Sequence, residues 1–118
     1  MIATHTKGSR WRHQVEMEFA NAGFQTSVRG IGWAGDDITV RRPIMRPKDW
    51  VPELILSVEA KNHKDITLSK FVDQAAVQAA SISQAALPLV VAHRRGRSDV
   101  DSAYFVMPGW AFIELVTR

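Results

Sequence analysis

The chain contains 118 residues, of which 46% are hydrophobic and 23% are charged, values typical of one globular domain rather than a disordered segment. It has no cysteine, which excludes a disulfide scaffold, a thiolate metal site and a cysteine nucleophile. The formal net charge of +3 is compatible with a nucleic-acid partner but does not demonstrate one. No apolar run approaches the roughly 20 residues of a membrane span, and the first residues lack the apolar core of a signal peptide. We therefore expect a soluble cytoplasmic protein, with a single domain over residues 1–118 and no membrane partner.

The chain is predicted to begin with an amphipathic helix. Ser9 can cap this helix, and Gly23 ends it after about residue 22. One face of the helix carries an apolar stripe formed by Trp11, Val15, Phe19 and Ala22. This spacing is typical of a helix that packs on a core, so we expect Trp11 to be buried.

Three strands are predicted next. The first covers residues 24–29, and a glycine-rich loop at 30–35 separates it from the second at 37–42. A basic loop with two prolines follows, and then comes the clearest strand, at 53–61. Its side chains alternate between two faces, one formed by Leu54, Leu56, Val58 and Ala60 and the other by Ile55, Ser57, Glu59 and Lys61.

The second half of the chain is predicted to contain a long helix at 68–86, strands at 88–93 and 103–107, and a short helix that starts at Pro108. The long helix has one apolar face formed by Leu68, Phe71, Val72, Ala75, Ala79, Ile82 and Ala86. The short helix carries Trp110, Ile113 and Leu115 on its predicted core stripe. The order helix, three strands, helix, two strands, helix predicts an α/β fold with one central mixed sheet.

Glu59 and Lys61 are two residues apart on the predicted strand, so their side chains emerge side by side on one face. Asp36 and Asp37 open the preceding strand, so an aspartate and Glu59 converge if the two strands are neighbours. Close carboxylates repel, and a hard cation such as Mg²⁺ relieves that repulsion. A lysine beside the metal can help to generate hydroxide or stabilise charge on a scissile phosphate. The alternative is a surface Glu–Lys pair on an edge strand.

Basic side chains gather in three clusters, at residues 7–13, 41–48 and 93–97. Each cluster alone is compatible with an ordinary solvated surface. Three clusters around one acidic group favour a polyanionic partner, held by phosphate contacts that weaken steeply with salt. The predicted DNA contacts are Lys7, Arg10, Arg12, Arg29, Arg41, Arg42, Arg46, Lys48, His63, Lys64, Arg94, Arg95 and Arg97. For His63 a solvated loop position is the alternative.

The sequence resembles the PD-(D/E)XK nuclease superfamily, and within it the archaeal-type Holliday junction resolvases and their relatives in phages of actinobacteria. The resemblance rests on Asp37-Ile38, on the stretch from Glu59-Ala60-Lys61 to Ile66, and on weaker matches at residues 7–9, 71–75 and 103–108. It implies a restriction-endonuclease-like core and a homodimer that nicks branched DNA with Mg²⁺ or Mn²⁺, in DNA recombination and repair. It also suggests a prokaryotic cell or a phage-infected host.

Carried over by position, the resemblance makes Asp37 and Glu59 metal ligands and Lys61 the residue that orients or activates the attacking water. Asp36 stands where the family often has proline, and it ranks second to Asp37 as a ligand. Gln74 matches a polar position that the family often places near the site. A solvated position on the helix is an equal alternative for Gln74.

The first helix departs from the family pattern. The resolvases carry a glutamate there, five residues after the lysine of Lys-Gly-Ser, and this chain has Arg12. Glu16 lies one turn later and could supply the missing carboxylate, or it could form an i,i+4 ion pair with Arg12. If that ion pair forms, the metal site lacks a carboxylate.

The sequence therefore predicts a metal-dependent endonuclease that resolves four-way DNA junctions. Two alternatives stay open: a related nuclease for other DNA structures, and a junction-binding protein with impaired catalysis. No phosphate-binding Gly-x-x-x-x-Gly-Lys loop is present, so we expect no nucleotide cofactor.

Overall fold

The computed structural model describes residues 7–28, 38–42, 53–62 and 67–117, with side chains from Ser9 onward. Its elements follow the predicted order, with one additional short 3₁₀ helix. They are α1 (Lys7–Asn21), β1 (Gln25–Val28), β2 (Ile38–Arg42), β3 (Leu54–Lys61), α2 (Leu68–Ile82), β4 (Ala86–Ala92), η2 (Val100–Ser102), β5 (Tyr104–Val106) and α3 (Gly109–Thr117). None of the helices in the described ranges combines the length and the apolar character needed to cross a membrane.

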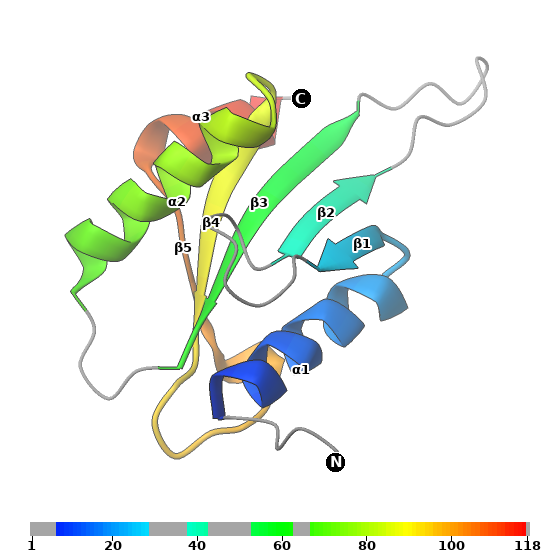
Figure 1. The fold of residues 1–118 in the computed structure, drawn as a ribbon, viewed down its shortest axis with the longest axis vertical. Helices are drawn as coiled ribbons and strands as arrows, with labels where there is room; N and C mark the ends of the chain where they lie inside the picture. The colour runs from blue at the N-terminus through cyan, green and yellow to red at the C-terminus, as the bar shows by residue number, and fades with distance from the viewer. Residues whose placement is uncertain (1–6, 29–37, 43–52, 63–66, 118) are drawn as a thin grey trace, which may run out of the picture.

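The strands form one mixed sheet in the order β1-β2-β3-β4-β5 (Figure 1). Neighbours pair antiparallel except for β3 and β4, which are parallel and joined through α2. A parallel pair requires such a crossover because the chain must return to the same end of the sheet. β3 is therefore an interior strand, and an edge-strand position for Glu59 and Lys61 is excluded.

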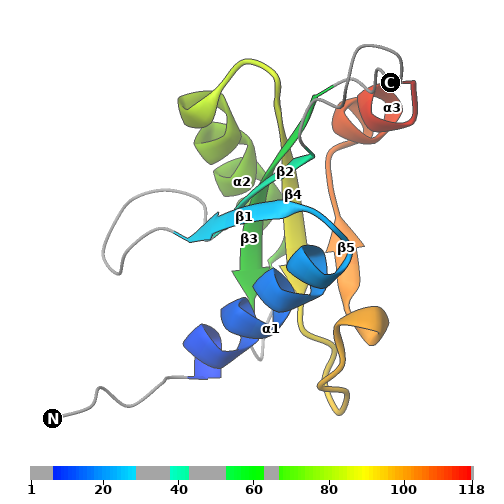
Figure 2. The same cartoon turned by 90° about the vertical axis from the view of Figure 1, so that its right-hand side faces the viewer.

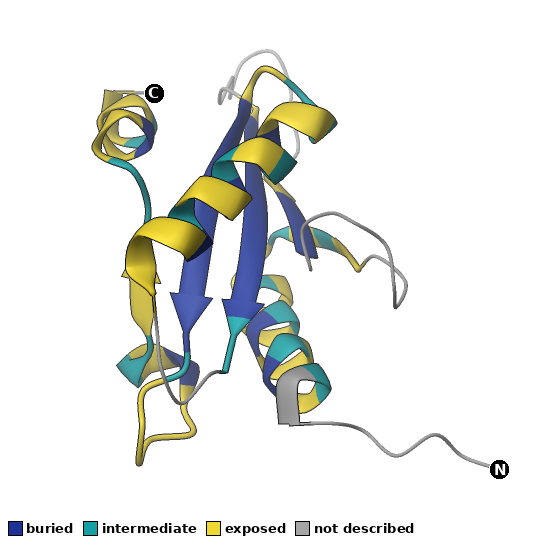
Figure 3. Ribbon diagram, turned by 60° about the vertical axis from the view of Figure 1, so that its left-hand side comes forward, coloured by how far each residue is buried: buried dark blue, intermediate teal, exposed yellow. Residues whose placement is uncertain are grey.

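The helices cover the two faces of this sheet (Figure 2). α1 and α3 lie on one face, where Trp11 and Ala111 join the main core cluster with Val58. α2 lies on the other face, where Ala79 packs with Ile55. Both faces of β3 are consequently buried from Leu54 to Ala60, as are those of β4 (Figure 3).

Trp11 holds α1 against the carboxyl ends of β3 and β4. Its side chain is only 1% exposed, and its Nε1–H donates a hydrogen bond to the Val91 carbonyl oxygen at 3.2 Å. Its ring meets the His93 ring edge-on, with centroids 4.6 Å apart. The prediction that Trp11 belongs to the core is confirmed.

Two predicted helix boundaries are wrong. α1 begins at Lys7, so Ser9 is its third residue rather than its cap. In a regular helix the Trp11 amide donates to the Lys7 carbonyl, four residues earlier, so the first turn of α1 starts before Ser9. α2 ends at Ile82, not residue 86. The Ser83 hydroxyl accepts the Ala85 N–H at 3.1 Å in a turn, which satisfies that amide outside the helix.

Ala86 is the first residue of β4 and pairs with Ile55. Its spacing from Ala79 and Ile82 is compatible with a helix, and the strand pairing overrides that local pattern. β4 therefore begins two residues before Pro88. The described pairing of β4 with β5 covers only Val90 to Ala92, so the missing N–H of Pro88 interrupts no bond to β5.

The predicted core stripe of the last helix is wrong at two positions. Trp110 and Ile113 are 56% and 62% exposed. Ala111 is fully buried instead, and Leu115 packs against the same cluster. α3 is apolar on nearly every side, so periodicity alone could not select the buried face.

Candidate active site

Glu59 and Lys61 form an ion pair near the carboxyl end of β3. Lys61 Nζ lies 3.4 Å from Glu59 Oε2, and the two side chains are 19% and 7% exposed, respectively. The predicted side-by-side arrangement is confirmed. An ion pair this sheltered must compensate a substantial desolvation cost, which sets it apart from a solvated surface pair.

α2 contributes a third group to this pair. Lys61 Nζ lies 5.0 Å from the centroid of the Phe71 ring, in cation–π geometry. Phe71 is 8% exposed, so its ring holds the ammonium in place from the helix side. The sequence pattern indicated only a core role for Phe71, because no motif signals which ring will face Lys61.

The predicted aspartates lie outside the described residues. Asp36 and Asp37 precede Ile38, the first residue of β2, and Ile38 pairs with Val58. Val58 is the residue immediately before Glu59, so β2 begins beside the part of β3 that carries Glu59. Their proposed role as metal ligands stays a prediction.

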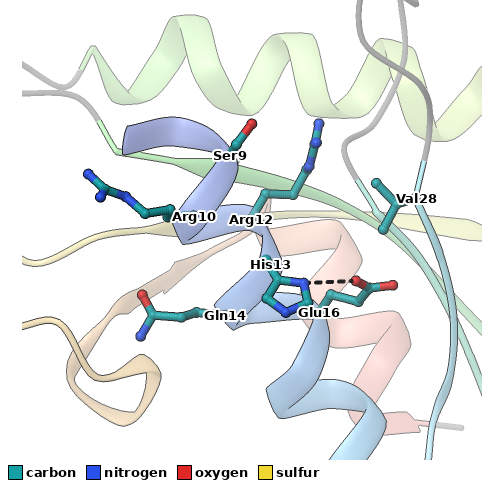
Figure 4. A pocket seen from close by; sticks show the side chains of 7 residues that line it. All are labelled: Ser9, Arg10, Arg12, His13, Gln14, Glu16 and Val28. Carbon is teal, nitrogen blue, oxygen red and sulfur yellow. Dashed lines mark ion pairs between the residues drawn. The ribbon is translucent and has the colours of Figure 1, made fainter. Parts of the chain in front are cut away.

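Glu16 contacts β1 rather than the Glu59–Lys61 pair. Thr26 Oγ1 donates a hydrogen bond to Glu16 Oε2 at 3.2 Å, and His13 Nδ1 lies 3.7 Å from Glu16 Oε1 (Figure 4). Glu16 therefore lies on the α1 side of the sheet. Glu59 faces α2, on the opposite side, so the described structure does not bring the two carboxylates together.

The alternative ion pair between Arg12 and Glu16 is also absent from the described residues. Arg12 is half-buried, and no ion pair is found for it in this part of the chain. It borders a cavity of about 650 Å³ between α1 and β1. The described lining of this cavity consists of Ser9, Arg10, Arg12, His13, Gln14, Glu16 and Val28, all shown in Figure 4.

Gln74 is exposed on α2, about one turn beyond Phe71. It makes no hydrogen bond with the Glu59–Lys61 pair within the described ranges, which agrees with a solvated helix position. His63 and Lys64 lie outside those ranges. The described residues also contain no group of three or more histidine, aspartate or glutamate side chains that could bind a metal.

One basic cluster lies at the same end of the sheet as Lys61. The backbone N–H of His93 donates to the Lys61 carbonyl oxygen at 2.8 Å, and the turn that follows carries three exposed arginines. They are Arg94, Arg95 and Arg97. Gln14 of α1 donates to the Ser98 carbonyl at 2.8 Å, which joins this turn to the helix of Arg10 and Arg12.

The carboxylate nearest to these bases in sequence is Asp99. The Ser102 hydroxyl donates a hydrogen bond to Asp99 at 2.5 Å. This bond lowers the pKa of the Asp99 carboxyl, with a smaller contribution from the charge of Arg97. Asp99 is therefore engaged within its own turn.

The basic cluster on β2 lies far from Lys61. Arg42 pairs with Leu54, at the opposite end of β3. Lys61 lies seven positions after Leu54 on β3, or about 23 Å away at a rise of ~3.3 Å per residue. Arg41 forms an exposed ion pair with Glu53 at 3.3 Å. The predicted DNA contacts that are described thus form two separate surfaces. Lys7 has no described side chain, and Arg29, Arg46 and Lys48 lie outside the described residues.

Comparison with solved structures indicates the fold. The chain is similar to Hjc from Archaeoglobus fulgidus, with a TM-score of 0.55 and 21% sequence identity, over 85% of this chain and 71% of that chain. That protein is a Holliday junction resolvase from an archaeal hyperthermophile. The present chain has the resolvase fold. No protein-family model and no curated protein matches the sequence.

The resolvase fold confirms the predicted α/β class and the resemblance at the level of architecture. At 21% identity this likeness shows the fold and not the activity of the present chain. The chemistry must therefore be argued from the Glu59–Lys61 pair and its surroundings.

Proposed function

We propose that this chain is a metal-dependent DNA endonuclease that cleaves four-way junctions. The observation that carries the proposal is the sheltered Glu59–Lys61 ion pair on an interior strand of a resolvase fold. Its alternation with Ala60 places both charges on one face at the end of the strand. The arginine turn after β4 lies at the same end and supplies cations for a phosphate backbone.

The residues available fit a magnesium ion. Mg²⁺ is commonly bound through one or two carboxylates together with water and substrate phosphate, so a complete cage of protein ligands is unnecessary. Glu59 provides one buried carboxylate, and Asp37, with Asp36 ranked second, would provide another. Mn²⁺ accepts the same oxygen ligands. When bound, the metal would lower the pKa of a coordinated water and neutralise charge on the scissile phosphate.

The chain's own residues would position the reactants. Glu59 orients the Lys61 ammonium through the 3.4 Å contact, and Phe71 restrains it through the cation–π contact. Lys61 is thereby preorganised to hold the attacking water or to stabilise negative charge on the phosphate. Preorganisation matters because a lysine side chain otherwise loses considerable rotamer entropy when it is fixed.

The activity is tested by incubating the purified protein with a synthetic four-way junction and a linear duplex of matched sequence. We expect paired nicks on the junction with Mg²⁺ or Mn²⁺ and none on the duplex. Removal of the metal with EDTA should abolish nicking, because water and phosphate both lose their activating cation. Metal-independent nicking would contradict the mechanism.

Two other results would select the alternative functions. Cleavage of flaps or single strands in preference to junctions would indicate a related nuclease for other DNA structures. Junction binding without nicks in Mg²⁺ or Mn²⁺ would indicate a binding protein that lacks catalysis, consistent with the position of Arg12 and with the separation of Glu16 from Glu59.

We also propose that the chain forms a homodimer through α3. Four large apolar side chains on this helix are 54–62% exposed: Trp110, Phe112, Ile113 and Val116. Residues 103–117 contain a single charged side chain, Glu114, which makes this surface unsuitable for DNA. A helix that is apolar on all sides is normally covered.

A second copy of the chain suits the α3 face. A twofold interface brings the same patch together with itself, and this nearly uncharged patch creates little like-charge repulsion. Each partner in a standard interface contributes about 800 Å², and an aromatic side chain can bury about 150–250 Å². Two copies would also supply two active sites for two opposing strands of a junction.

The homodimer is tested by light scattering of the protein as it elutes from a size-exclusion column. We expect twice the 13.2 kDa mass of the chain, and a shift to the monomer for Ile113→Glu, because the dimer would bury an unpaired charge. Val77→Glu introduces the same charge at a 69% exposed site on α2 and should leave the dimer intact. A monomeric wild-type protein would contradict the proposal.

A further inference from the structure

A second exposed apolar surface, separate from that of α3, lies beside the candidate active site. Tyr104, on β5, is 53% exposed, and Leu68, at the start of α2, is 50% exposed. They border a cavity of about 460 Å³, whose described lining is Leu68, Ala92 and residues 103–106. A cavity of this size with mainly apolar walls is in the range that accommodates a small organic group.

Tyr104 is in register with Lys61. Lys61 pairs with Ala92, and Ala92 pairs with Tyr104, so the three residues form one row across β3, β4 and β5. Directly paired residues share a face of the sheet, which here is the face covered by α2. Two strand spacings separate Tyr104 from Lys61, or about 10 Å between Cα atoms.

Arg94 gives the Tyr104 ring a charged companion. Its guanidinium carbon lies 5.9 Å from the ring centroid, within cation–π distance. The Tyr104 ring therefore borders an apolar cavity and also contacts Arg94, a cation that can bind phosphate. This combination of an exposed ring and an arginine is typical of surfaces that stack an unpaired base while they hold its backbone.

We propose that the Tyr104 cavity binds an unpaired nucleobase next to the scissile phosphate. The proposal rests on the proposed function, because Lys61 defines where that phosphate lies. Tyr104 stacks on the base, Leu68 forms the apolar wall, and Arg94 contacts the neighbouring phosphate. A fully paired duplex offers no free base to this cavity, so Tyr104 contributes selectivity for branched or distorted DNA.

The experiment compares DNA binding by the wild-type protein with binding by Tyr104→Leu and Tyr104→Phe in EDTA. The probes are a four-way junction with 2-aminopurine at the branch and a paired linear duplex with the same label. Tyr104→Leu should bind the junction about 5- to 150-fold more weakly, the range for removal of one stacking ring, and should lose the 2-aminopurine quenching. Its affinity for the duplex should change less than about 2-fold, and Tyr104→Phe should behave as wild type because it keeps the ring.

Three results would overturn the proposal: wild-type junction affinity for Tyr104→Leu, an equal loss on the duplex, or a change in molar mass, which would assign the ring to a protein contact. Circular dichroism spectra of the variants establish that they fold. Because binding is measured in EDTA and nicking in Mg²⁺, the two proposals fail separately. A wild-type protein that never nicks DNA contradicts the nuclease function, while the binding comparison alone decides the role of Tyr104.

Discussion

Glu59→Gln is expected to abolish junction nicking while the protein still binds the junction. The substitution keeps the size of a 7% exposed side chain but removes the charge that would bind the metal and orient Lys61. We expect a loss of at least about 10²- to 10³-fold in rate, the scale for removal of one group that stabilises charge in a transition state. Single-turnover nicking in Mg²⁺ measures the rate, and gel-shift titration in EDTA measures binding.

The partner variant, Lys61→Met, separates catalysis from stability. Methionine keeps an unbranched stem near Phe71 but removes the positive charge that faces the buried Glu59. We expect a rate loss of similar size. We also expect the free energy of unfolding to decrease by about 1–3 kcal/mol. The double variant Glu59→Gln/Lys61→Met should regain most of that stability and none of the activity. This result would assign the pair to catalysis rather than to folding.

Asp73→Asn is the matched control for these variants. Asp73 is exposed on α2, and the same carboxylate-to-amide change there should leave nicking and stability unchanged. Nicking by Glu59→Gln within tenfold of the wild-type rate would remove Glu59 from the active site.

Trp11→Ala is expected to cause a large loss of stability. The side chain is 1% exposed, and its loss creates a cavity and leaves the Val91 carbonyl without the indole hydrogen bond. Truncation of a buried aromatic costs about 3–5 kcal/mol, a large part of the roughly 5–15 kcal/mol that stabilises a typical domain. Urea unfolding monitored by far-UV circular dichroism gives the midpoint and the slope.

Val77→Ala provides the comparison for Trp11. Val77 is 69% exposed on α2, so its truncation should change the free energy of unfolding by no more than about 0.5 kcal/mol. Trp11→Phe should fall between the two, because it retains most of the apolar contact but cannot donate to Val91. A Trp11→Ala protein with the wild-type unfolding midpoint would contradict the assigned packing of α1.

The sequence by itself determined the local features of this protein. Strand residues alternate with a period of two, so Glu59 and Lys61 had to share a face once β3 was recognised. Helical spacing was sufficient to place Trp11 in the core, and the element order was sufficient to indicate an α/β sheet. These are short-range consequences of backbone geometry, and the structure confirms each of them.

Only the tertiary structure decided which distant residues meet. The placement of α1 and α2 on opposite faces separates Glu16 from Glu59, although Glu16 lies only one helical turn after the position where the family has its glutamate. Strand direction carries the Arg41 end of β2 away from Lys61. The apolar pattern of α3 could not tell Ala111 from Trp110, because nearly every side of that helix is apolar.

The same long-range pairing brings Tyr104 into the row of Lys61, more than forty residues away in sequence. No local pattern contains this information, because strand order and register depend on the packing of the whole sheet. Sequence reasoning therefore identified the charged pair on β3. The fold decided that Phe71 contacts Lys61, that Tyr104 lies two strands away in the same row, and that Glu16 contacts β1 instead.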